Sequence, residues 1–195
     1  MKKKERSVNI PTIEEVENEQ KRLRHRAVYQ RTLRGTIAVL LVVAAISVLV
    51  ATLWMPVLQI YGSSMSPTLE ARQIVVSVKT NQLKTGEVVA FWQGNKLLVK
   101  RVIAGPGQWV DIDMDGNVTV DGKELTEDYL DVKALGNCDV ELPHQVEESR
   151  WFLMGDNRDV SVDSRSVAIG DVSKDQIEGK IVFRIWPLNK TGSIQ

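Results

Sequence analysis

The sequence predicts a mainly β protein: an antiparallel, barrel-like β domain preceded by one N-terminal transmembrane α-helix. Two observations carry this prediction. Residues 36–55 form an uncharged apolar run of about 20 residues, enough to cross a bilayer core as a helix. After it, short runs rich in Val, Ile and aromatic residues alternate with turn signals, as is typical of antiparallel β domains.

Three parts are expected along the chain: a basic tail at 1–35, a signal-anchor helix at 36–56 and a β domain at 57–195. The tail carries ten Lys and Arg against five Glu. Arg31 and Arg34 flank the apolar run, so the positive-inside rule predicts a cytoplasmic N-terminus and an extracytoplasmic β domain. Thr12 and Glu15 have the spacing of a capping box, which favours a helix toward Arg34. A solvated tail is the alternative.

The apolar run itself is interpreted as an uncleaved membrane anchor. Trp54 stands at its outer end, where an aromatic belt is expected. The run is longer than the apolar region of a secretory signal, and Leu49-Val50-Ala51 is a poor cleavage site. A buried core helix is disfavoured because the run has no polar face. Only about eight residues lead from Trp54 to Ser64, which keeps this serine within about 30 Å of the membrane surface.

Composition excludes several classes of function. Lys+Arg and Asp+Glu both number 25, so no basic excess points to nucleic acid. The single cysteine, Cys138, cannot form an internal disulfide and has no Cys or His ligand set around it. We interpret Cys138 as a partly buried thiol and expect neither a metal nor a cofactor.

The β domain is expected to consist of short strands separated by Gly, Asn and Pro turns. Residues 123–150 are acidic and polar, and we expect loops there. The strand-like runs are 57–61, 73–79, 86–92, 96–103, 109–113, 118–120, 151–154 and 181–186.

Two stretches carry residues suited to nucleophilic chemistry. Ser63, Ser64 and Ser66 crowd around Met65, a composition that taken alone indicates only a loop. Residues 97–103 place Lys100 inside an apolar run. Because strand side chains alternate between faces, either Lys100 or its neighbour Arg101 is expected to be carried inward. A desolvated lysine can act as the base for a hydroxyl; a lysine reaching to water from an edge strand is the alternative.

Other chemistries fit less well. His25 precedes the membrane span, and His144 is expected on a surface loop, which disfavours a Ser–His hydrolase. The segment 62–66 also lacks the second Gly of an esterase nucleophile elbow. Residues 155–165 hold three Asp and two Arg. They favour a loop tied by Asp–Arg pairs over a Ca²⁺ site, because the two arginines oppose a cation.

Three stretches, 64–69, 100–107 and 155–165, resemble the conserved boxes of type I signal peptidases, in the same order. Residues 179–188 are similar to the C-terminal strand of that family, and the single span is similar to its Gram-positive form. The resemblance covers about residues 36–190. It implies a serine endopeptidase with a Ser–Lys dyad, anchored in the plasma membrane. Such an enzyme removes N-terminal signal peptides from exported preproteins, cutting after small residues at the outer membrane surface.

The resemblance also implies roles for individual residues. Ser64 matches the nucleophile and Lys100 the general base. Ser161 resembles the hydroxyl that orients the lysine amine, and Asp163 with Arg165 resembles a structural ion pair beside the site. The backbone N–H of Ser64 is expected to donate to the oxyanion.

The chain departs from the family pattern at four places. Gly62 stands where some members carry a serine that helps the oxyanion hole, so one donor is absent or replaced by backbone or water. Ser63 stands where Gly is common, and Gln73 where Asp is usual. The segment 166–170 is longer than the usual link. These departures leave the dyad in place and concern local geometry and rate.

Substrate is expected to bind as an extended peptide against residues 57–62 and 97–100, by β-augmentation. Small side chains at the first and third positions before the cut would fill shallow pockets lined by Ile60, Met65, Leu98 and Val99. For any one of these four, ordinary core packing is the alternative. The expected partners are signal-peptide-bearing preproteins, the lipid bilayer and, as a candidate, the secretion translocase.

Two other functions compete with the peptidase. A self-cleaving regulator with a Ser–Lys pair is disfavoured by the membrane anchor, because such regulators are soluble. A degenerate relative acting only in assembly should have lost the dyad. Ser64, Lys100 and Ser161 are all present.

Overall fold

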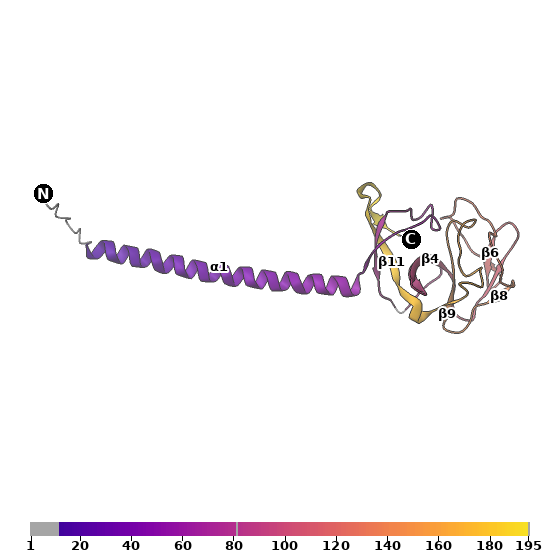
Figure 1. Cartoon of the computed structure of the whole chain (residues 1–195), viewed down its shortest axis with the longest axis horizontal. Coiled ribbons are helices and arrows are strands. Elements are labelled where there is room, and N and C mark those ends of the chain that lie inside the picture. The colour runs from indigo at the N-terminus through magenta and orange to yellow at the C-terminus, as the bar shows by residue number, and fades with distance from the viewer. Residues whose placement is uncertain (1–11, 81, 195) are drawn as a thin grey trace, which may run out of the picture. The chain divides into compact units, whose positions relative to one another are not determined.

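A computed structural model describes residues 12–80 and 82–194 (Figure 1). The chain divides into two compact units, residues 1–50 and 51–195. The described part of the first unit is helical, and the regular structure of the second is mainly β-strands. Residues 1–11 of the expected tail lie outside the described part of the chain.

One continuous helix, α1 (Ile13–Trp54), contains both the expected tail helix and the apolar run. Its start is capped as expected: the Thr12 N–H donates to the Glu15 carboxylate at 2.9 Å, and the Glu15 N–H donates to the Thr12 hydroxyl at 3.4 Å. Within it, Ile13–Val50 is long and apolar enough to cross a membrane, and none of its most apolar window is buried by the protein. An apolar helix left uncovered in this way is compatible with membrane anchoring.

The β unit consists of two antiparallel sheets, which confirms the mainly β prediction. The larger sheet has strands at its two ends that do not pair with each other, so it curves without closing into a barrel. Its strand order is β1 (Val57–Gln59), β2 (Ile74–Val78), β11 (Ile177–Trp186), β3 (Val88–Gln93), β4 (Lys96–Ala104), β9 (Arg150–Met154) and β10 (Val172–Ser173), with β12 (Gly192–Ser193) beside β11. The smaller sheet has the order β7 (Lys123–Glu124), β6 (Val118–Val120), β5 (Trp109–Ile112) and β8 (His144–Gln145).

Each of the eight expected strand runs contains a strand, with boundaries shifted by a few residues. The sequence missed β7, β8, β10 and β12, which are two residues long and too short to show a period. Residues 123–150 are otherwise irregular, as expected. Two short 3₁₀ helices, η1 (Lys174–Gln176) and η2 (Leu188–Lys190), flank β11.

Strands β3 and β4 are covered on both faces. Val88 and Ala90 pack in one hydrophobic cluster, whereas Val89 and Phe91 pack in another. A third cluster joins the end of β4 to the small sheet. Because of this double coverage, Lys100 and Arg101 are both buried, on opposite faces of β4. The expectation that only one of the two cations is carried inward was therefore wrong, because both side chains are buried.

Candidate active site

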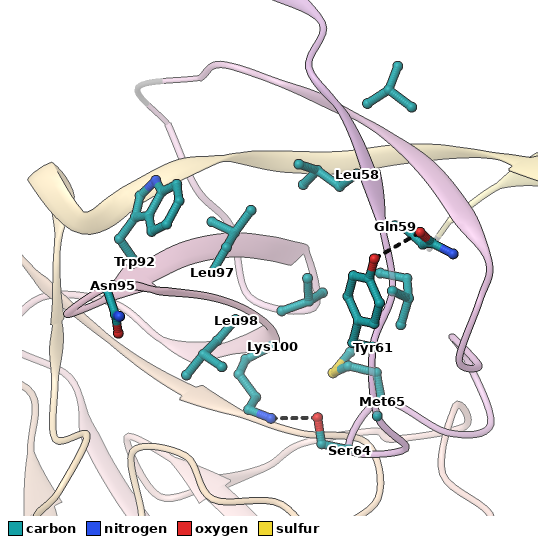
Figure 2. A pocket seen from close by; sticks show the side chains of 14 residues that line it. Leu58, Gln59, Tyr61, Ser64, Met65, Trp92, Asn95, Leu97, Leu98 and Lys100 are labelled. Atoms are coloured by element: carbon teal, nitrogen blue, oxygen red, sulfur yellow. Dashed lines mark hydrogen bonds between the residues drawn. The ribbon is translucent and has the colours of Figure 1, made fainter.

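The structure brings Ser64 and Lys100 into direct contact. The Lys100 Nζ donates to the Ser64 Oγ at 2.7 Å (Figure 2). Lys100 is only 3% exposed, so the alternative of a lysine reaching to water is wrong. The pKa of Lys100 is lowered to about 8, chiefly by burial. The charge of Asp163 opposes this shift, that of Arg165 adds to it, and that of Asp156 opposes it. A useful fraction of the amine is therefore neutral near neutral pH and can accept a proton.

The loop that carries Ser64 is fixed by packing and by backbone hydrogen bonds. Met65 and Leu69 of this loop are buried, and the Leu69 N–H donates to the Met65 carbonyl at 2.8 Å. The Asn157 N–H donates to the Ser64 carbonyl at 3.0 Å. The serine is thus held in place by both its own loop and the loop 155–165.

Gly155 lets the loop 155–165 approach Ser64 closely. A Cβ at Gly155 would lie 2.2 Å from the Ser161 Oγ and 2.5 Å from the Ser64 carbonyl oxygen, distances that no side chain can occupy. Ser161 is buried, and within the described chain its Oγ has no hydrogen-bond partner. The structure places this hydroxyl beside the serine loop, without a hydrogen bond to the Lys100 amine.

Asp163 and Arg165 form a bidentate ion pair with both side chains fully buried. Arg165 Nε lies 2.8 Å from Asp163 Oδ1, and Arg165 Nη2 lies 2.9 Å from Oδ2. Burial alone would raise the pKa of Asp163, but the Arg165 guanidinium and the Gly155 N–H hold it below its usual value. The Gly155 N–H donates to Asp163 Oδ2 at 2.9 Å, so the pair also fixes the glycine beside Ser64.

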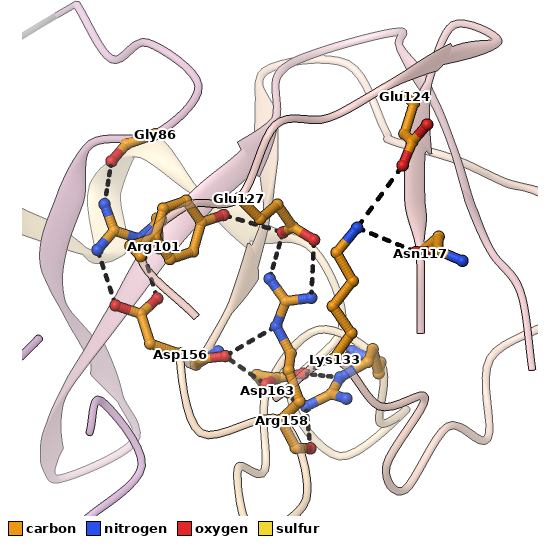
Figure 3. A network of polar contacts seen from close by, with 12 residues as sticks. Gly86, Arg101, Asn117, Glu124, Glu127, Lys133, Asp156, Arg158 and Asp163 are labelled. Atoms are coloured by element: carbon orange, nitrogen blue, oxygen red, sulfur yellow. Dashed lines mark hydrogen bonds and ion pairs between the residues drawn. The ribbon is translucent and has the colours of Figure 1, made fainter. Parts of the chain in front are cut away.

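Two further buried ion pairs extend from this one and were not anticipated (Figure 3). Arg101 binds Asp156 through two hydrogen bonds of 2.9 and 2.7 Å, and Arg158 pairs with Glu127. The Tyr129 ring lies 3.8 Å from the Arg101 guanidinium carbon, and its hydroxyl donates to Glu127 at 2.9 Å. The expected loop 123–150 thus supplies two members of the network, the buried Glu127 and the half-buried Tyr129. No local sequence signal marks them, because their partners are about 30 residues away.

A groove of about 490 Å³ leads away from the Ser64–Lys100 pair. It runs between the segment 57–62 and strand β4, with Ser64 and Lys100 at one end and Trp92 and Asn95 at the other (Figure 2). The four residues named from the sequence as pocket lining all border it. Ile60 and Met65 belong to a core cluster as well. Val57, Leu58, Gln59, Tyr61, Gly62 and Leu97, from the two segments expected to bind the peptide, also line it. Trp92 and Asn95 are the two lining residues that the sequence did not indicate.

Both walls of the groove are open strand edges. β1 ends the larger sheet, so only one of its edges is paired. β9 pairs with β4 only between Arg101 and Ala104, and no described strand pairs with residues 96–100 on that side. Open edges of this kind accept an added strand.

Gly62, which stands where some family members carry a serine donor, has a left-handed φ of +83° and open space around it.

His144 does not belong to the site. It lies half-buried in β8, and its Nε2 is 3.0 Å from Asp171 Oδ1. The expectation of a surface-loop histidine was wrong. Cys138 is half-buried and free, as expected. Among the described residues, no group of three or more His, Cys, Asp or Glu is arranged to hold a metal.

Comparisons with known proteins identify the class. Residues 33–186 match the family model described as signal peptidase, peptidase S26. Signal peptidase IB from Staphylococcus aureus is 36% identical over 152 residues, covering 67% of this chain and 78% of that protein. Signal peptidase I from Bacillus amyloliquefaciens is 35% identical over 140 residues, covering 66% and 75%. A solved signal peptidase I from Enterococcus faecalis V583 is 25% identical, covers 52% of this chain and 98% of its own, and has a TM-score of 0.43.

The protein is a peptidase whose N-terminal apolar helix is compatible with membrane anchoring. More specifically, the chain belongs to the peptidase S26 family of signal peptidases, hydrolases that remove signal peptides.

Proposed function

We propose that this chain is a membrane-anchored serine endopeptidase that removes N-terminal signal peptides from exported preproteins with a Ser64–Lys100 dyad. One observation carries the proposal: a buried lysine amine lies 2.7 Å from a serine hydroxyl at the end of an open groove. A nucleophile within hydrogen-bond reach of a base of lowered pKa is the arrangement that acyl transfer requires.

The chemistry follows from the state of the amine. Neutral Lys100 takes the proton of Ser64 as the Oγ attacks the scissile carbonyl carbon. The resulting ammonium gives that proton to the leaving amine as the peptide bond breaks. An acyl-enzyme remains, and Lys100 then deprotonates the water that hydrolyses it.

The residues around the dyad have supporting roles in this proposal. The Ser64 N–H donates to the oxyanion; Gly62 offers no side-chain donor. The Ser161 hydroxyl, buried and unpaired in the described chain, orients the Lys100 amine once substrate is bound. Asp163 holds Gly155 in place, while the charge of Arg165 lowers the pKa of the base.

The preprotein binds as a strand between the segment 57–62 and residues 97–100 of β4. The Val102 N–H and carbonyl point toward the β3 side. Because backbone groups alternate along a strand, those of Leu97 and Val99 point toward the open edge and can pair with the peptide. Ile60, Met65, Leu98 and Val99 restrict the side chains at the first and third positions before the cut to small ones, so the enzyme cuts after A-x-A-like sites.

The enzyme acts at the outer surface of the plasma membrane in this proposal. Arg31 and Arg34 flank the apolar part of α1 and retain the N-terminus in the cytoplasm. The short segment from Trp54 to Ser64 then keeps the site near the lipid surface, with the domain 57–195 outside. The secretion translocase, which delivers preproteins, is a candidate partner.

The test uses the detergent-solubilised full chain and a preprotein, with the cut read by mass spectrometry. We expect the wild type to cut after a small-x-small sequence, and Ser64→Ala and Lys100→Ala each to abolish the cut with unchanged circular dichroism. Lys96→Ala, an exposed lysine on the same strand, is the matched control and keeps activity. Cleavage retained in either dyad variant would overturn the proposal.

A further inference from the structure

The groove continues well beyond the dyad, and three apolar side chains border its far end beside Asn95. Leu58, Trp92 and Leu97 border it there (Figure 2). Trp92 is 43% exposed, so the fold does not need it as core. Its indole Nε1 donates to the Glu178 carboxylate at 3.0 Å. This hydrogen bond fixes the ring and satisfies its only polar atom, leaving apolar surface on the groove.

A second hollow next to the serine loop has the opposite character. It is lined by Ser66, Asn157 and Asp159 together with the paired Asp156 and Arg158. A peptide bound across Ser64 and Lys100 therefore has apolar side chains in the groove that leads away from them, and polar side chains in the second hollow beside the serine loop. A signal peptide has a matching asymmetry, because an apolar region precedes its small-residue cleavage site.

The register of β3 and β4 indicates which residue of the bound peptide lies at the far end of the groove. Leu97 and Val99 share one face of β4, and Trp92 pairs with Leu97 on that same face of β3. Side chains at the first, third and fifth positions before the cut likewise share one face of an extended peptide. The fifth lies about 13 Å from the first, at about 3.3 Å per residue. Leu97 is about 10 Å from Lys100 on the same scale. The fourth peptide residue is the one level with Leu97, but its side chain points to the other face. The fifth, about 3 Å farther along, is therefore the nearest side chain on the face of Leu97 and Trp92.

We propose that Leu58, Trp92 and Leu97 form an apolar subsite that selects a large apolar side chain at the fifth position before the cut. The subsite rests on the proposed peptidase function and is continuous with its peptide groove. It makes the enzyme read the end of the apolar segment of the signal peptide in addition to the small residues at the cut.

The test compares two preproteins that differ only in Leu or Gln at the fifth position. We expect the wild type to cut the Leu substrate with a kcat/KM about tenfold higher, the size that one apolar side chain in a pocket gives. Trp92→Ala should bring the ratio of the two substrates close to one. Trp109→Ala is the matched control, since this tryptophan of β5 is 47% exposed and does not border the groove; it should keep the wild-type ratio.

An equal rate for both substrates in the wild type, or an unchanged ratio in Trp92→Ala, would overturn the subsite. These outcomes are separable from failure of the proposed function. Ser64-dependent cutting of the Gln substrate at the small-x-small site would show that the peptidase stands while the subsite fails. Absence of any Ser64-dependent cut would overturn both.

Discussion

The α-carbon of Gly155 faces the hydroxyl of Ser161 so closely that an added Cβ would lie 2.2 Å from its oxygen. The same Cβ would lie 2.5 Å from the Ser64 carbonyl. Gly155 follows directly on β9, so its position is set by the sheet and by its hydrogen bond to Asp163. The close approach of the two loops at Ser64 therefore depends on the absence of a side chain at residue 155.

Gly155→Ala should displace the serine loop or the loop 155–165. We expect a loss of about 1–3 kcal/mol in the free energy of unfolding, as for other overpacked sites, and at least a hundredfold loss of kcat/KM, on the order expected for a nucleophile moved by about 1 Å. Denaturant unfolding and preprotein cleavage measure the two effects. Gly192→Ala is the control, because nothing lies within 4 Å of its Cβ position. Full activity in Gly155→Ala would contradict the structure.

Cleavage should rise with pH as Lys100 loses its proton. Burial lowers the pKa of Lys100 to about 8, and only the neutral amine can take the Ser64 proton. We expect kcat/KM to rise about tenfold per pH unit below pH 8 and to level off above it. His144→Gln should leave this profile unchanged, since His144 is bound to Asp171. An ascending limb governed by a pKa near 6.5 that disappears in His144→Gln would contradict the lysine as base.

Replacing the base by an apolar side chain should stabilise the fold while abolishing activity. The pKa of Lys100 falls from 10.5 to about 8 on folding, so the folded state disfavours its charged form. This cost is fully present below pH 8, is about 3 kcal/mol there, and disappears as pH rises toward 10.5. Lys100→Met should therefore raise the free energy of unfolding by about 1–3 kcal/mol at pH 7.

The measurement is denaturant unfolding of the detergent-solubilised chain at pH 7 and near pH 10. The increase in unfolding free energy of Lys100→Met over wild type should be smaller at the higher pH. The folded wild type then holds a neutral amine, and the amine of part of the unfolded chains is neutral as well. A gain that is equal at both pH values would show that packing, and not the charge of Lys100, is responsible.

Glu127 should matter for stability although it lies in an acidic loop. Its carboxylate pairs with the buried Arg158 and accepts from Tyr129. Glu127→Ala leaves the Arg158 charge buried without its partner, which costs about 3–5 kcal/mol. Asp128→Ala, at the exposed neighbouring carboxylate, should change the unfolding free energy by less than about 0.5 kcal/mol. If the two substitutions changed the free energy of unfolding equally, the ion-pair network of Figure 3 would not stabilise the fold.

Local patterns were enough to predict most elements of the fold. The apolar run and the Thr12–Glu15 cap indicate α1 because helix formation and capping depend on residues within a few positions. Alternating Val and Ile runs between turns indicate the main strands for the same reason. The two-residue strands β7, β8, β10 and β12 escaped, because their existence depends on a partner strand and not on their own sequence.

The sequence by itself determined the class of protein and the apolar helix, and it singled out Ser64 and Lys100 as candidates, because ordered motifs and apolar runs are properties of neighbouring residues. Only the tertiary structure decided that Lys100 and Arg101 are both buried, that Glu127 and Tyr129 join the ion pairs behind the site, and that the groove extends to Trp92. These features arise largely from contacts between residues far apart in the sequence, where burial, charge pairing and strand register are set by tertiary packing.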